Sequence, residues 1–165
     1  MKIGIVGSGS IGANAARLFV RAGHEVALSN SRGGQGLEAL VEELGDRSHA
    51  TTIEDTAKFG EVVLIAIPFD KYRTLPQDAF KGKVVIDAGN YYPERDGKFP
   101  ELDGDETTSS EMMASHLKEA RWSKALTQSI SNISPVRATR VCRWRSGARF
   151  SSPVTTRRRK RLLRG

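Results

Sequence analysis

The chain has 165 residues, with 26 lysines and arginines, 19 aspartates and glutamates, and one cysteine. This length suits one domain with a proper core, and no apolar run approaches the roughly 18 residues of a membrane-spanning helix. The single Cys142 excludes a disulfide within the chain, and the sequence begins with a strand pattern instead of a signal peptide, so we expect a cytoplasmic protein with no membrane partner.

The excess of positive over negative charge lies in the C-terminal quarter of the sequence. Residues 121–165 contain 13 of the 26 basic residues and none of the 19 acidic ones. This segment has no sustained apolar period and no helix caps, which is typical of disorder. We therefore expect an acidic domain over 1–120 and a disordered basic tail over 121–165.

The first twelve residues predict a phosphate-binding turn. The apolar run Lys2–Val6 predicts a buried strand, and the helical spacing of apolar residues after it predicts a helix that begins at Gly12. Between them lies a G-x-G-x-x-G pattern, in the place that a Rossmann-type dinucleotide site requires. A structural turn that binds nothing is the alternative. The candidate cofactor-binding residues are Gly7, Ser8, Gly9, Ser10, Ile11 and Gly12.

Each glycine of this pattern has a physical task in such a site. Gly7 permits the tight turn, Gly9 lets the backbone approach a pyrophosphate, and Gly12 lets the helix pack closely on the strand. The free backbone N–H groups at the start of the helix, with the positive end of its dipole, would hold the phosphates.

The elements that follow alternate between strands and helices, which predicts an α/β fold: a single domain with a Rossmann-like, doubly wound parallel sheet. We expect a helix capped by Thr52 and one capped by Ser109 or Ser110. In chain order the expected elements are a strand at Glu25–Ser29, a helix at Leu37–Leu44, a strand around Ala50–Thr51, a helix through Lys58, strands at Glu61–Ile67 and Lys83–Ala88, a helix at Glu111–Lys118 and a sixth strand near Ser123–Leu126.

Groups that often carry catalysis or bind metals are sparse. His24 lies in an expected turn, and no second ligand is spaced to join it in a metal site. His116 is expected to face solvent, and Met112 and Met113 to lie in the core. We assign no catalytic residue and no metal ligand from the sequence.

The end of the second expected strand indicates which dinucleotide is bound. An NAD site usually has an acidic residue there for the ribose hydroxyls, but this chain has Asn30, Ser31 and Arg32. A hydroxyl and a guanidinium suit the 2′-phosphate of NADP(H), whereas a carboxylate would repel it. A solvated turn arginine is the alternative. The sequence therefore favours NADP(H).

On four motifs the chain resembles the deazaflavin-dependent NADP oxidoreductase family, which includes the coenzyme F420 reductases. These motifs are GSGSIG at Gly7–Gly12, NSR at Asn30–Arg32, AIPF at Ala66–Phe69 and DAGNYYPERDG at Asp87–Gly97. The N-terminal domain of pyrroline-5-carboxylate reductases is a more distant likeness. The resemblance covers about residues 1–121.

The resemblance implies hydride transfer between NADPH and a deazaflavin, coenzyme F420, or another small acceptor. Such a reaction depends more on the orientation of two rings than on protein acids and bases. By position in the motifs, Ile67, Pro68 and Phe69 would border the nicotinamide and Asn90 would face it.

The likeness ends after Ala120. Family members continue with a strand similar to VVKAFNTI, whereas this chain continues as RWSKALTQSI. One choice of codons for Leu126–Ser134, shifted by two bases, encodes a continuation typical of the family. Our hypothesis is that the last quarter is out of frame or the family's C-terminal part is truncated.

Two other functions stay open on the sequence. One is an NADP-binding or regulatory module without turnover. The other is a nucleic-acid-binding protein that uses the basic tail, although Trp122 and Trp144 do not form the repeated aromatic pattern of such proteins. We expect a small-molecule partner and no specific nucleic acid. A homodimer is also open.

Overall fold

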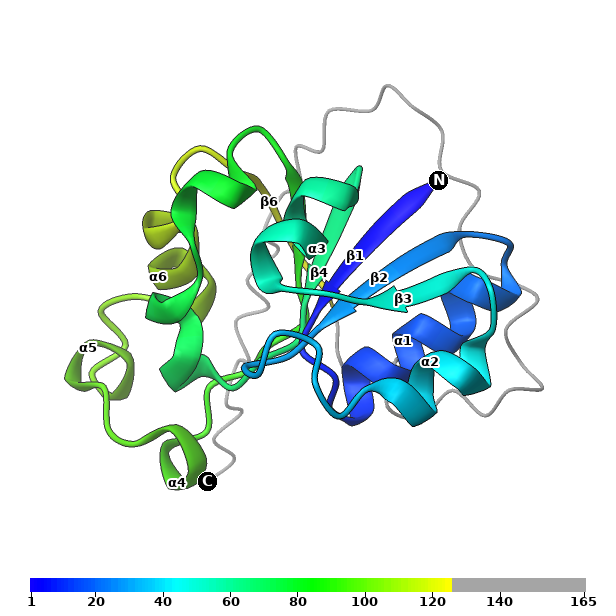
Figure 1. Cartoon of the computed structure of the whole chain (residues 1–165). Helices are drawn as coiled ribbons and strands as arrows, with labels where there is room; N and C mark the ends of the chain where they lie inside the picture. The colour runs from blue at the N-terminus through cyan, green and yellow to red at the C-terminus, as the bar shows by residue number, and fades with distance from the viewer. Residues whose placement is uncertain (126–165) are drawn as a thin grey trace, which may run out of the picture.

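A computed structural model describes residues 1–125 of the chain (Figure 1). The expectations for Cys142, for Trp144 and for most of the basic tail lie outside these residues. Within the described range no helix is long and apolar enough to cross a membrane.

The described chain contains one parallel sheet of six strands in the order β3-β2-β1-β4-β5-β6 (Figure 1). Every neighbouring pair is parallel, which confirms the predicted α/β, Rossmann-like fold. The strands are β1 (Lys2–Val6), β2 (Glu25–Ser29), β3 (Ser48–Ala50), β4 (Val62–Ile65), β5 (Val84–Asp87) and β6 (Arg121–Lys124).

Helices connect the strands and cover both faces of the sheet. Because side chains alternate along a strand, neighbouring residues enter different cores. Ile5 packs with residues of α1 and α2, whereas Val6 packs with residues of α3, η1, η2 and α6. The helices are α1 (Ser10–Arg21), α2 (Glu38–Leu44), α3 (Ile53–Phe59), α4 (Pro93–Asp96), α5 (Pro100–Asp103) and α6 (Ser109–His116), and the 3-10 helices are η1 (Phe69–Thr74) and η2 (Gln77–Phe80).

The cap of α3 is where the sequence placed it, but the cap of α6 is not. The Thr52 hydroxyl accepts a hydrogen bond from the Asp55 backbone N–H at 3.1 Å. Helix α6 begins at Ser109, two residues earlier than expected, and Thr108 forms a capping box with Glu111. The prediction of Ser109 or Ser110 as the cap was wrong, because Thr108 has the required three-residue spacing to the glutamate.

His116 is half-buried, whereas the sequence predicted that it faces solvent. Its Nε2 lies 2.9 Å from the Leu75 carbonyl oxygen, and its ring meets that of Tyr72 edge-on at 5.7 Å. The contact joins α6 to η1, two segments whose packing the sequence pattern does not define. Met113 is buried in the core as expected, and Met112 packs partly buried against it.

The sixth strand begins slightly earlier than expected. β6 covers Arg121–Lys124 and pairs with β5, so that Lys124 lies beside Asp87. The first residues of the segment 121–165 therefore belong to the sheet. This strand brings a lysine to the edge of the site described below.

Candidate dinucleotide-binding site

The strand order reverses between β1 and β4. From β1 the chain proceeds through β2 and β3 in one direction, and β4, β5 and β6 extend the sheet in the other. At such a switch point the connections that follow the two central strands separate, and this opens a crevice at their carboxyl ends. The glycine turn after β1 and the loop after β4 form its two sides.

The glycine turn has the geometry that its sequence predicts. Gly7 has a φ of +107°, a conformation that side chains rarely adopt, and its N–H donates to the Ser29 carbonyl oxygen at 2.9 Å. A Cβ at Gly12 would overlap the Gly7 carbonyl oxygen. Helix α1 therefore packs so closely on the turn that only a glycine fits at position 12.

Gly9 differs from both of these glycines, because a Cβ placed on it would meet no atom of residues 1–125 within 4 Å. It precedes α1, a helix of 12 residues, and no side chain of the described residues caps the helix at this end. Backbone N–H groups and the positive end of the helix dipole therefore face the open space beside Gly9. This arrangement fits the diphosphate of a dinucleotide.

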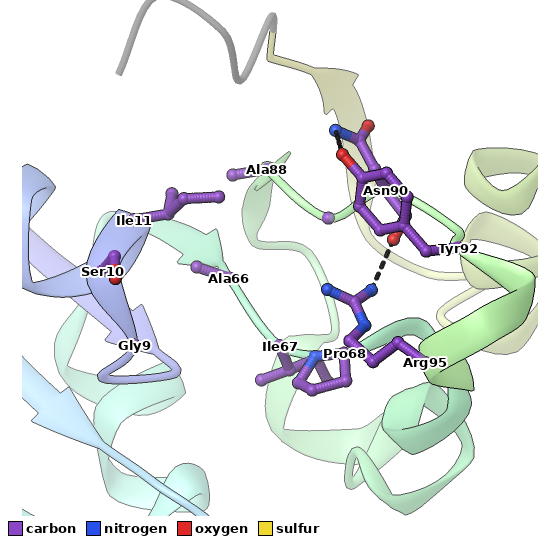
Figure 2. A pocket seen from close by; sticks show the side chains of 11 residues that line it. Gly9, Ser10, Ile11, Ala66, Ile67, Pro68, Ala88, Asn90, Tyr92 and Arg95 are labelled. Atoms are coloured by element: carbon purple, nitrogen blue, oxygen red, sulfur yellow. Dashed lines mark hydrogen bonds between the residues drawn. The ribbon is translucent and has the colours of Figure 1, made fainter. Parts of the chain in front are cut away.

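Two adjoining cavities lie along this crevice. The β2-side cavity, about 530 Å³, includes Gly7, Ser8, Asn30, Ser31 and Lys71 in its lining. The β5-side cavity, about 430 Å³, includes Ser10, Ile11, Asn90, Tyr92 and Arg95 (Figure 2). They share Gly9, Ala66, Ile67 and Pro68. Together they form one elongated site with the glycine turn at its middle.

Most of the residues singled out from the sequence line this site, but three do not. Gly12 is buried beneath the turn, and Arg32 is exposed outside both linings. Phe69 is 2% exposed and packs among the rings of Tyr72, Tyr91 and Phe99. Its position supports the wall of the site from within the core.

Asn30 organises the loop after β2. Its Oδ1 accepts hydrogen bonds from the N–H groups of Arg32 at 2.7 Å and Gly34 at 3.3 Å. Its Nδ2 donates to the Gln35 carbonyl oxygen at 2.8 Å. The amide thus fixes the loop that displays Ser31 and Arg32.

The Arg32 guanidinium lies over Gly36 in this loop. Nearby, hydrogen bonds from the backbone N–H groups of Glu38 and Gly36 lower the pKa of the Glu38 carboxyl, and the charge of Arg32 adds to this. Among residues 1–125 Arg32 takes part in no salt bridge. Its neighbour Ser31 belongs to the lining of the β2-side cavity.

A buried carboxylate fixes the turn after β5. Asp87 accepts hydrogen bonds at 2.8 Å from the Gly89 N–H, the Ser110 hydroxyl and the Lys124 ammonium. Lys124 also donates to the Gly89 carbonyl oxygen. Strand β6 and helix α6 thereby hold the backbone that presents Asn90 to the cavity. The sequence shows the Asp-Ala-Gly-Asn run but not these partners.

An ion pair beside Asn90 was not predicted from the sequence. The Arg95 guanidinium bonds both oxygens of Asp96, at 2.7 and 2.8 Å, and donates to the Asn90 carbonyl oxygen at 2.7 Å. Burial alone would raise the pKa of Asp96, but hydrogen bonds from Arg95 and the Tyr92 N–H bring it below its ordinary value. The hydrogen bond to Asp96 raises the pKa of Arg95. Both residues of the pair lie in the turn-rich loop Asn90–Gly97. The position of this loop after a strand was the signal in the sequence that could have drawn attention to them.

The linings of the two cavities offer backbone N–H groups, small hydroxyls and two cations, Lys71 and Arg95. In the part of the chain that the structure describes, no three histidine, cysteine or acidic residues are grouped to hold a metal ion. Such a site suits the binding and orientation of an anionic, elongated ligand. Fold and site together define a Rossmann-type dinucleotide-binding domain.

Comparison with known proteins gives the family. The model of the family described as NADP oxidoreductase, coenzyme F420-dependent, matches residues 2–91. The match covers more than half of the sequence, and the chain belongs to this family. A comparison with curated protein sequences finds no match.

Several solved structures share the fold. A hypothetical protein from Sinorhizobium meliloti is 24% identical with a TM-score of 0.66, over 79% of this chain and 65% of its own. A proposed F420-dependent NADP-reductase from Arthrobacter sp. FB24 is 22% identical with a TM-score of 0.67, over 77% and 62%. The 3-hydroxyisobutyrate dehydrogenase of Mycobacterium tuberculosis is 13% identical with a TM-score of 0.54, over 74% and 38%. This chain thus spans somewhat less than two thirds of the length of each of the first two proteins.

Proposed function

We propose that this protein is an NADP(H)-dependent oxidoreductase that transfers hydride between NADPH and a deazaflavin such as coenzyme F420. The observation that carries the proposal is the open glycine turn at the switch point, with a cavity on each side of it. Membership of the F420-dependent NADP oxidoreductase family supports the choice of both reactants.

In this proposal the chain's own residues bind and orient the cofactor. The backbone at Gly9 and the amino end of α1 would hold the diphosphate. The β2-side cavity would hold the adenosine half and the β5-side cavity the nicotinamide half, with Ile67 and Pro68 between them. The bound nicotinamide supplies the hydride. Proximity and alignment are the protein's contribution, because the described residues of the two linings contain no acid–base pair.

The end of β2 supports NADP(H) over NAD(H). It carries no acidic side chain, and the loop fixed by Asn30 carries Ser31, which lines the β2-side cavity, followed by the exposed Arg32. A guanidinium forms charge-assisted hydrogen bonds with a phosphate, which the 2′-position of NADP(H) provides and that of NAD(H) does not.

A hydride-transfer assay tests the proposal. Purified full-length protein is mixed with NADPH and oxidised coenzyme F420, and both absorbances are followed, while NADPH binding is measured separately by calorimetry. We expect NADPH to be oxidised and F420 reduced in equal amounts. Binding of NADPH without oxidation would contradict the proposed reaction and favour an NADP-binding module without turnover.

A further inference from the structure

The β5-side cavity contains one charged side chain among its described lining residues, Arg95 (Figure 2). Its guanidinium is held by both oxygens of Asp96 and by the Asn90 carbonyl oxygen, and it lies 5.0 Å from the centre of the Tyr92 ring. Each contact restricts its rotation. The guanidinium is therefore oriented before any ligand arrives, which lowers the entropic cost of binding one.

These contacts use Nε and Nη2 and leave the second terminal nitrogen, Nη1, with no hydrogen bond among residues 1–125. Figure 2 shows this nitrogen pointing into the cavity, towards the opposite wall formed by Gly9, Ser10 and Ile11. Asp96, whose side chain is fully buried, accepts hydrogen bonds from the Nε and Nη2 edge of the guanidinium. The donor face of the arginine is thus turned towards the space that a substrate would occupy.

The charges around this cavity favour an anion. No carboxylate of residues 1–125 belongs to its lining, and the amino end of α1 forms part of its far wall. The nearby Asp87 is buried and bonded to Lys124, and Asp70 is bonded to Lys71 at 2.7 Å. Asp87 and Asp70 therefore each have a basic partner, and the positive potential of the Arg95 donors and the helix end extends into the cavity.

We propose that Arg95 binds a negatively charged group of the hydride acceptor, and that the acceptors of this protein are therefore phosphate- or carboxylate-bearing molecules. This inference rests on the proposed function. The acceptor is the expected occupant because, in the proposed function, the phosphates of NADPH would bind elsewhere, at the Gly9 turn and at the Asn30–Arg32 loop. Arg95 belongs to the opposite wall of the β5-side cavity.

The first test needs no acceptor. With the protein saturated by NADP⁺, inorganic phosphate is titrated while the backbone amide NMR signals of Gly89 and Tyr92 are followed. The matched variant is the double substitution Arg95→Gln and Asp96→Asn, which removes both charges and leaves no buried carboxylate unpaired. We expect saturable shifts in the wild type and none in the variant. Absence of shifts in the wild type would overturn the inference.

The second test compares two deazaflavins, coenzyme F420 and the same ring system without its phosphate- and carboxylate-bearing side chain. Their binding to the NADP⁺ complex is measured by fluorescence, so that no turnover is required. We expect the double variant to bind F420 at least about tenfold more weakly and the truncated compound nearly unchanged. Arg73→Gln is the control, because Arg73 is an exposed arginine outside both cavities.

The outcomes separate the two proposals. If phosphate binds at Arg95 but wild-type protein neither binds nor reduces F420, the anion site stands and the proposed acceptor is wrong. If F420 binds equally to the wild type and the double variant, the role of Arg95 is wrong while the proposed function stands. An equal loss of NADPH and F420 binding in the double variant would assign Arg95 to the cofactor and overturn the inference.

Discussion

At the scale of single residues, Asn30 and Arg32 have different roles in the loop after β2. The Asn30 amide bonds three backbone groups and fixes the loop, whereas the Arg32 guanidinium is exposed at its surface. A change at Arg32 should therefore alter what the loop binds, and a change at Asn30 should alter the loop itself.

The Arg32→Ala variant should distinguish the two cofactors. Loss of a charge-assisted hydrogen bond to the 2′-phosphate costs about 1.5–3 kcal/mol, so NADPH should bind roughly 10- to 100-fold more weakly. NADH lacks this phosphate, and its affinity should change by less than about threefold. Calorimetric titration of both cofactors measures this, with Arg73→Ala as the control. Equal losses for NADPH and NADH would mean that Arg32 shapes the loop and does not bind the phosphate.

The structure also limits what Asn30→Asp can show. From the sequence, an aspartate there would repel the 2′-phosphate and accept hydrogen bonds from the ribose hydroxyls. In the structure its carboxylate would face the Gln35 carbonyl oxygen, which now accepts from Nδ2 at 2.8 Å. The substitution would disturb the loop as well as the charge, and Arg32→Ala is the cleaner experiment.

The stability contributed by the Asp96 carboxylate should depend on pH. Its pKa in the folded protein lies below its ordinary value of about 3.9, so folding favours the charged form. This contribution is present above about pH 4 and is lost as the pH falls through the lowered pKa. Urea unfolding of wild type and Asp96→Asn from pH 7 to pH 3 measures it. We expect a stability difference that is constant down to about pH 5 and then shrinks; a difference independent of pH would contradict the assignment.

At the scale of elements, β6 links the outer edge of the sheet to the site. Its Lys124 is the cation paired with the buried Asp87, and it also bonds the carbonyl of Gly89. Both contacts hold the turn that presents Asn90 to the β5-side cavity. The strand therefore contributes to the site without lining it.

Lys124→Met should destabilise the protein and loosen this turn. It leaves the Asp87 carboxylate buried with its Gly89 and Ser110 hydrogen bonds but without a counter-charge, which costs about 1–3 kcal/mol. Urea unfolding at pH 7 gives the change in free energy, and Lys118→Met, at an exposed position, is the control. Equal stability of the two variants would show that the Asp87 pair contributes nothing measurable.

At the scale of the whole molecule, features with a local cause could be predicted from the sequence. The glycine pattern at Gly7–Gly12 and the apolar strands depend on neighbours along the chain, and the sheet and the turn follow from them. Features that depend on partners far apart in the sequence could not be predicted. Lys124 lies 37 positions from Asp87, and His116 lies 41 from Leu75. The inward position of Phe69 depends equally on the distant ring of Phe99.

The central claim, that the Gly9 turn receives the cofactor diphosphate, is tested most directly by Gly9→Val. The backbone at Gly9 has φ −67° and ψ −175°, which valine tolerates, and its Cβ would meet open space. The fold should therefore survive, while the side chain occupies the place of the diphosphate. NADPH titrations of wild type and variant, with melting temperatures as the check on folding, give the answer. We predict an affinity loss of at least about 100-fold, about 2.7 kcal/mol, with a nearly unchanged melting temperature; NADPH binding equal to that of the wild type would contradict the account.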